Sequence, residues 1–174
     1  MLNKKSVFNM VYAVALVSAI TSCFGFLNEL LNIAQLYKIN ILNTVYMKGD
    51  AYKEPMFFYS AAFAISAIAV AFLLLQLVWG NKRYGDVIKI VCNVMLVVAC
   101  ALMIALSFGY VFSARYVGVS KEHYNIKYFD YMVYYTIRSG VMSFVASIAV
   151  ILGCNLIDAR SKKAKTTTQV EKAE

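Results

Sequence analysis

The sequence predicts an all-α, polytopic integral membrane protein: a bundle of four transmembrane helices with its N- and C-termini on the cytoplasmic side. Of its 174 residues, 61% are hydrophobic and 15% are charged, whereas about 25% of the residues in a soluble domain are charged. The charges separate four apolar runs, and each run reaches the ~20 residues that a helix needs to cross a bilayer. A chain of this length forms a single domain.

The first apolar run covers residues 6–36 and contains one acid, Glu29. A cleaved leader is the alternative, because residues 20–23 resemble the box at which bacterial lipoproteins are cleaved before a cysteine. The apolar character continues past Cys23 to Ile33, and three more runs follow. We therefore expect residues 6–36 to remain as the first span.

The second run, residues 56–79, holds no charge and ends at Trp79. Tryptophan is common where a span meets the lipid head groups. Pro55 is the only proline and suits the first turn of this helix, because the N–H that proline lacks has no partner there.

Residues 80–86 form a short polar connection with two glycines, which predicts that the second span packs antiparallel to the third span, residues 87–112. The fourth span covers residues 131–157. We expect residues 1–160 to form one membrane domain. Residues 161–174 should be a disordered cytoplasmic tail, because their polar composition cannot build a core.

Lysine and arginine are more numerous on the side of both termini and of the 80–86 connection. Ten lie there, against six in the two longer loops, residues 37–55 and 113–130. Loops rich in these residues remain in the cytoplasm. We therefore expect cytoplasmic termini, and we place the protein in the plasma membrane.

The net charge of +8 does not indicate nucleic-acid binding, because the basic residues flank apolar runs, where head groups and topology account for them. All four cysteines fall inside apolar runs, which argues against a disulfide-linked outer domain. His123 is the only histidine, so the chain lacks the usual ligand sets of haem and zinc. We expect no cofactor, no metal site and no catalytic residue.

Each span carries small residues spaced three or four apart, a pattern that lets membrane helices approach closely. These rows predict a compact bundle, but they do not distinguish contacts within the chain from contacts with another subunit. The expected packing residues are Ser18, Ser22, Gly25, Ala64, Ala71, Ala101, Ala105, Gly109, Ser139, Ser143 and Ser147.

Two ionisable side chains lie within the spans, Glu29 in the first and Arg138 in the fourth. Such residues are costly in a membrane and are functional candidates. Their depths below the outer ends of the spans match, at ~8 Å and ~10 Å. We predict that they pair and join the two spans. The alternatives are that each side chain reaches the head groups separately, or that one or both form a ligand site.

Tyrosines gather at the outer ends of the spans. An aromatic belt at the head groups explains such a cluster, and a recognition surface is the alternative, because tyrosine supplies rigid amphipathic contact area. The residues of this outer aromatic surface are Tyr124, Tyr128, Tyr131 and Tyr135, and Tyr59 flanks the other outer loop.

The leading functional expectation is a non-enzymatic multi-pass membrane protein: an accessory, assembly or scaffold subunit that acts through helix–helix and outer-loop contacts. Its partners are then the lipid bilayer, other membrane proteins or copies of itself. The alternative is a small oligomeric transporter or channel subunit with Glu29 and Arg138 lining the pathway. A membrane enzyme ranks third, because the sequence offers no catalytic constellation.

Cysteine labelling tests the predicted orientation. The Lys121→Cys variant should react with an impermeant thiol reagent on intact cells, and Lys163→Cys should react only after permeabilisation. The unsubstituted chain is the control, since its own cysteines lie within apolar runs. The reverse pattern would exchange the two sides of the topology.

Overall fold

The computed structural model describes the backbone of residues 4–43, 53–80, 85–116 and 124–171, and the side chains of residues 6–35, 55–80, 85–109 and 138–161. This part of the chain is all-helical. Its elements are α1 (Lys4–Asn43), α2 (Lys53–Trp79), α3 (Gly85–Tyr116) and α4 (Tyr124–Glu171).

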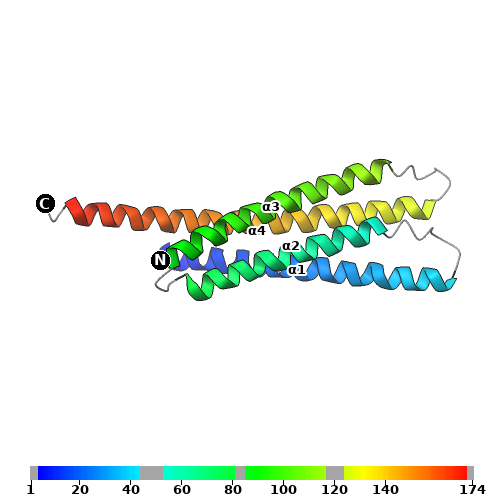
Figure 1. The fold of residues 1–174 in the computed structure, drawn as a ribbon, viewed down its shortest axis with the longest axis horizontal. Helices are drawn as coiled ribbons and strands as arrows, with labels where there is room; N and C mark the ends of the chain where they lie inside the picture. Colours follow the sequence, from blue (N-terminus) through cyan, green and yellow to red (C-terminus); the bar gives the residue numbers. More distant parts are fainter. Residues whose placement is uncertain (1–3, 44–52, 81–84, 117–123, 172–174) are drawn as a thin grey trace.

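The four helices form an elongated antiparallel bundle (Figure 1). α1 packs against both α2 and α4, and α2 packs against α3, whereas α3 and α4 pack less extensively. Each helix contains a segment long and apolar enough to cross a membrane: Ser6–Gln35, Pro55–Trp79, Gly85–Gly109 and Arg138–Ser161. The predicted all-α class and the four apolar helices are therefore confirmed.

The helices are longer than the apolar runs that predict them. α1 continues to Asn43 and α4 begins at Tyr124, so both predicted outer loops are shorter than expected. α4 also continues to Glu171, which differs from the disordered tail expected after residue 160. The physical reason is that extending an existing helix adds one hydrogen bond per residue without a new nucleation cost. The tail also contains alanine, lysine and glutamine, which favour helix.

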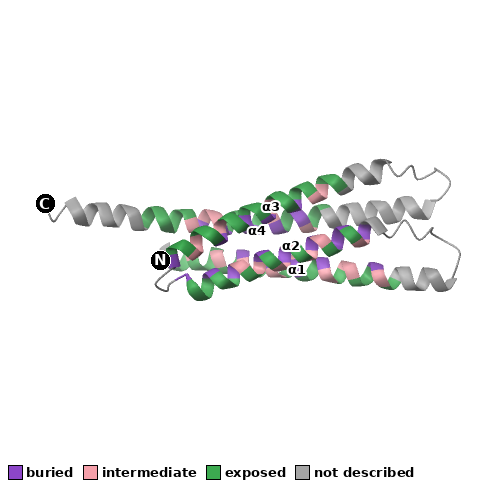
Figure 2. Ribbon diagram, viewed as in Figure 1, coloured by how far each residue is buried: buried purple, intermediate pink, exposed green. Residues whose placement is uncertain are grey.

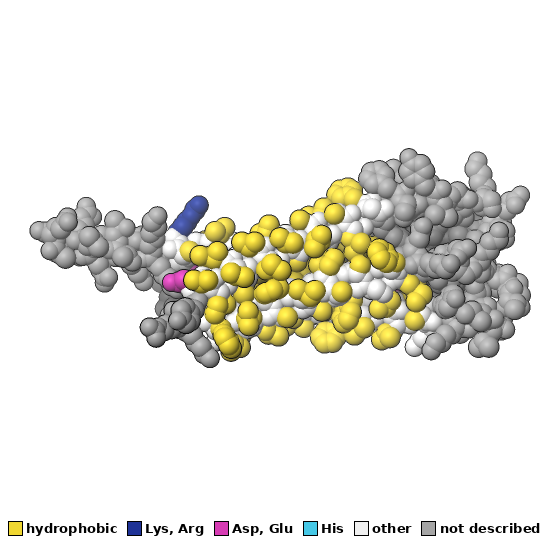
Figure 3. Space-filling model, viewed as in Figure 1, with side chains coloured by type: hydrophobic (Ala, Val, Ile, Leu, Met, Phe, Trp, Pro, Cys, Tyr) yellow, Lys and Arg dark blue, Asp and Glu magenta, His cyan; other side chains and the backbone are white. Residues whose placement is uncertain are grey.

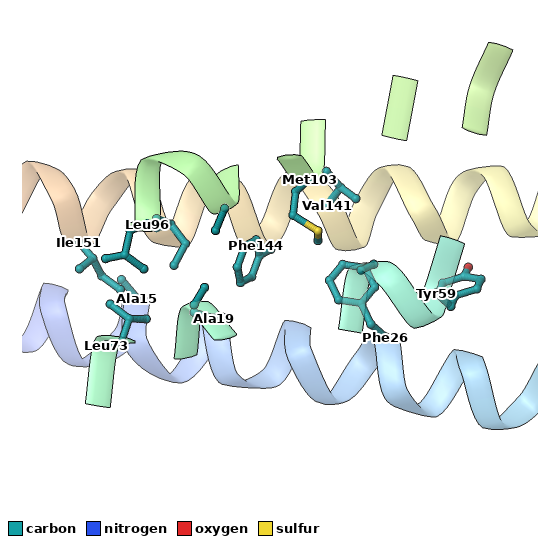
Figure 4. Packing of buried hydrophobic residues seen from close by; sticks show 14 of the residues in the cluster. Ala15, Ala19, Phe26, Tyr59, Leu73, Leu96, Met103, Val141, Phe144 and Ile151 are labelled. Atoms are coloured by element: carbon teal, nitrogen blue, oxygen red, sulfur yellow. The ribbon is translucent and has the colours of Figure 1, made fainter. Parts of the chain in front are cut away.

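The centre of the bundle is filled by large side chains from all four helices (Figures 2 and 4). Tyr59 belongs to this core at 1% exposure, and its ring packs edge-to-face against Phe58 with a centroid separation of 5.4 Å. Tyr59 flanks an outer loop in the sequence, but its position on α2 turns its side chain into the bundle. The other large side chains that are almost fully buried are Phe144, Leu73, Leu96, Met103, Ile148 and Ile151.

The outer surface of the bundle is apolar along most of its described length (Figure 3). Phe57 is 70% exposed, Val14 is 68% exposed and Phe24 is 64% exposed. Only 22–33% of each apolar segment is buried inside the bundle. Soluble monomers rarely expose continuous apolar surface on this scale, so this surface calls for a lipid or protein environment.

Two glycines hold the connection between α2 and α3 close together. The Gly80 N–H donates to the Gln76 carbonyl oxygen at 2.9 Å. A β-carbon on Gly85 would collide with the carbonyl oxygen of Gly80. The end of the bundle that holds Gly80 and Gly85 is called the turn end below.

Gly85→Ala should therefore destabilise the protein by about 1–3 kcal/mol, the usual cost of forcing an atom into a filled space. Gly25→Ala is the matched control, because a β-carbon on Gly25 has nothing within 4 Å and alanine favours helix over glycine. Thermal unfolding in detergent measures both. Equal melting temperatures for Gly85→Ala and the unsubstituted protein would contradict the close approach of the two glycines.

Candidate functional site

The contact between α1 and α4 is built from serines. The hydroxyls of Ser18 and Ser147 form a hydrogen bond of 2.7 Å, and those of Ser22 and Ser143 form one of 3.3 Å. The Ser147 hydroxyl also lies 2.7 Å from the Ser143 carbonyl oxygen. These four predicted packing residues are thus brought together, because small polar side chains let two helices approach and hydrogen-bond.

The same two helices touch again one turn further along. A β-carbon on Gly140 of α4 would lie 3.0 Å from the ring of Phe26, which is 2% exposed. The missing side chain of Gly140 therefore makes room for the ring. Ser139, also predicted to pack, is exposed, although it makes a contact of its own.

A groove of about 480 Å³ runs beside this serine contact. It is open and mostly apolar, and its walls come from α1 and α4. The residues that line it are Met10, Val11, Val14, Ala15, Ser18, Ser143, Ala146, Ser147 and Val150. An acyl chain fits its chemistry, since the polar groups of the groove are already hydrogen-bonded to one another.

The predicted small rows of α2 and α3 face away from the bundle. Their expected packing residues, Ala64, Ala71, Ala101, Ala105 and Gly109, are all exposed, and so is Gly25 of α1. They therefore take no part in the packing within the bundle, and a contact of these rows with another subunit, the other possibility that the pattern leaves open, stays a prediction. The inward faces are a different set, which includes Ala62, Ser66 and Ala69 on α2 and Leu96, Ala99 and Met103 on α3. α2 carries small residues on two opposite faces, so the sequence pattern alone did not show which face of α2 turns inward.

Glu29 and Arg138 lie at similar heights but are not brought together. The pairing of Ser18 with Ser147 places Glu29 level with position 136, only about 3 Å from the level of Arg138. Arg138 is nine residues before Ser147, which turns it about 180° away from the contact with α1. Arg138 is exposed, Glu29 is partly buried, and no ion pair joins them in the described structure. The depths of the two residues therefore match as predicted, but Arg138 lies on the side of α4 that faces away from α1.

Polar side chains meet at the turn end between α3 and α4. The Asn155 side-chain amide donates to the Asn93 side-chain oxygen at 2.8 Å, which joins the two helices. Beyond this pair lies a pocket of about 330 Å³, called the α3–α4 pocket below. Its lining residues are Asp86, Lys89, Ile90, Asn93, Asn155, Asp158 and Ala159.

Sequence reasoning missed this pocket because it counted Lys89 only as a topology signal. A usable signal was present, since positions 86, 89 and 93 share one face of α3 and positions 155 and 158 share one face of α4. Gln76 of α2 is a further buried polar residue, at 5% exposure, whose side-chain oxygen has no hydrogen-bond partner.

The predicted outer aromatic surface lies outside the described side chains. Tyr124, Tyr128, Tyr131 and Tyr135 fall on the first part of α4, where only the backbone is described, and His123 precedes that helix. Among the residues that the structure does describe, no cluster of three histidine, cysteine or acidic side chains is arranged to hold a metal ion.

Comparison with known proteins does not extend this description. No protein-family model, curated protein or solved structure matches the chain. Functional inference therefore rests on the geometry of the chain itself.

Double-mutant cycles separate the two polar contacts between α1 and α4. Ser18→Ala and Ser147→Ala should be non-additive, with a coupling of about 0.5–1.5 kcal/mol, because they share a hydrogen bond. Glu29→Gln and Arg138→Gln should add to within about 0.5 kcal/mol, because their side chains do not meet. Detergent melting of the single and double variants gives both couplings. Strong coupling of Glu29 to Arg138, or none between the serines, would contradict the described geometry.

Proposed function

We propose that this chain inserts into the plasma membrane with both termini cytoplasmic and acts there as a non-enzymatic accessory, assembly or scaffold subunit. Its partners are other membrane proteins or copies of itself. The apolar outer surface and the four apolar helices support insertion, and the distribution of lysine and arginine supports the orientation.

The observation that carries the proposal is the outward placement of the small rows on α2 and α3. Ala64 and Ala71 lie on the side of α2 opposite the core, and Ala101 lies opposite the core on α3. Small residues on a lipid-facing surface gain little from lipid, but they let the backbone of another helix approach. Two such rows on neighbouring helices favour a protein partner at this face.

A transport pathway through one copy has less support. The described interior is filled by large apolar side chains, and its buried polar residues are Ser66, Gln76 and Ser147. Glu29 and Arg138 do not face a common space, because Arg138 points away from α1. A pathway lined by these two residues therefore requires an interface between copies.

Enlarging the outward rows tests the proposal. Ala64→Ile and Ala105→Ile should weaken association in mild detergent by about tenfold, since a bulky residue at a close helix contact costs about 1–3 kcal/mol. Neither should lower the melting temperature of the bundle, because both positions are exposed. Chemical crosslinking and size-exclusion chromatography of the purified complex measure the association.

Ala149→Ile is the matched control, because Ala149 is an exposed alanine on α4 outside the two rows. It should leave association unchanged. A purified chain that is monomeric and carries no co-purifying protein would count decisively against the proposed function. If all three substitutions weaken association equally, the two rows are not the interface.

A further inference from the structure

The α3–α4 pocket brings together opposite charges that are not paired with each other. Lys89 is partly buried and Asp86 is exposed, and both line the pocket. No ion pair joins Lys89 to another residue in the described part of the chain. Asp158, on the opposite wall, makes a contact of its own. A cavity of about 330 Å³ between such groups is at the lower end of the range for ligand pockets.

The polar groups of the pocket are ordered along the bundle axis. The Asn93–Asn155 hydrogen bond lies nearest the middle of the bundle. Lys89 lies about 6 Å closer to the turn end than Asn93, and Asp86 lies about 4.5 Å beyond Lys89. On α4, Asp158 lies about 4.5 Å beyond Asn155 in the same direction, which puts it at about the level of Lys89. From the apolar region outward, the amides therefore come first, Lys89 follows, and Asp86 lies outermost.

This order matches the head group of an amine-bearing phospholipid. From the acyl chains outward, such a lipid presents ester carbonyls, then a phosphate, then a primary ammonium. Amide N–H groups donate to carbonyl oxygens, a lysine ammonium binds phosphate, and carboxylates accept hydrogen bonds from a primary ammonium. Each level of the pocket thus faces the chemical group that it can bind.

The surroundings of the pocket suit a lipid. Val87, Ile90 and Val94 of α3 are 62%, 64% and 56% exposed and continue the apolar surface beside it. In Figure 3 the charged side chains in view lie at the edge of this apolar surface, at the turn end. The residues that line the pocket include no aromatic side chain, and aromatic cages are the usual site for quaternary ammonium groups. A primary amine is therefore favoured over choline.

We propose that the α3–α4 pocket binds a phosphate ester that carries a primary amine, supplied by the head group of phosphatidylethanolamine. Lys89 holds the phosphate, Asp86 receives the ammonium, and the Asn93–Asn155 pair faces the ester carbonyls. This inference rests on the proposed membrane insertion, but it does not depend on any protein partner.

Thermal unfolding of the purified full-length chain in detergent tests the assignment. Phosphatidylethanolamine should raise the melting temperature at about tenfold lower concentration than phosphatidylcholine with the same acyl chains, because one charge-assisted hydrogen bond is worth about a factor of ten. Phosphatidylglycerol, which lacks the amine, should resemble phosphatidylcholine. Water-soluble phosphoethanolamine distinguishes the source: a shift with it alone shows that the head-group chemistry suffices, and a shift with the lipid alone shows that the pocket requires the glycerol esters.

Asp86→Asn should abolish the preference for phosphatidylethanolamine over phosphatidylcholine, because Asp86 receives the primary ammonium that distinguishes the two lipids. Lys89→Gln should weaken the binding of both lipids, because both carry the phosphate, whereas Arg160→Gln should change neither. Arg160 is the matched control, because it is an exposed basic residue near the same end of α4 and does not line the pocket. If Lys89→Gln does not fold, Asn93→Ala replaces it and should likewise weaken the binding of both lipids. Equal shifts with all three lipids, or a preference that survives in Asp86→Asn, would overturn the assignment. Carbonate extraction of membranes separately checks insertion, so failure of the lipid assignment is distinguishable from failure of the proposed function.

Discussion

The contact between the first and last helices is the constraint on which the rest of the bundle depends. α3 and α4 pack less extensively than the other neighbours, so α4 is held chiefly by α1. That contact joins residues more than a hundred positions apart in the chain, and it is made by paired serine hydroxyls and by the Phe26 ring against Gly140. In an apolar environment without a hydrophobic driving force, close approach and hydrogen bonding supply the attraction between helices. The order of α2 and α3 in the ring then follows from their short connections.

Much of the fold was predictable because hydropathy and turn residues report on it directly. Apolar length defined the four helices, and Gly80 with Gly85 indicated the antiparallel pair α2 and α3. The serine row was predictable on α1 and α4, where Ser18, Ser22, Ser143 and Ser147 stand out from larger neighbours. The ends of the helices were not predictable. Hydropathy indicates the thickness of hydrocarbon that a segment can span, but it does not indicate where the backbone hydrogen bonds of the helix stop.

Rotation about the helix axis was the quantity that sequence patterns predicted least well. Ala64 and Ser66 are two residues apart on α2, yet one is exposed and the other is fully buried. In a span that is apolar all round, no polar face marks the outside. The same uncertainty affected Arg138, whose depth agreed with that of Glu29 while its direction did not. The α3–α4 pocket escaped prediction for a related reason, since its charges come from two helices whose relative register only the Asn93–Asn155 contact reveals.

The length of α4 has a mechanical consequence. Its 48 residues extend about 72 Å, more than twice the ~30 Å of a hydrocarbon core. Its C-terminal part projects past the other three helices at the turn end (Figure 1). A continuous helix behaves as a stiff rod, so a tilt of α4 inside the bundle is amplified into a sideways displacement of its far end. The C-terminal end of α4 is thereby coupled mechanically to the packing of α4 against α1.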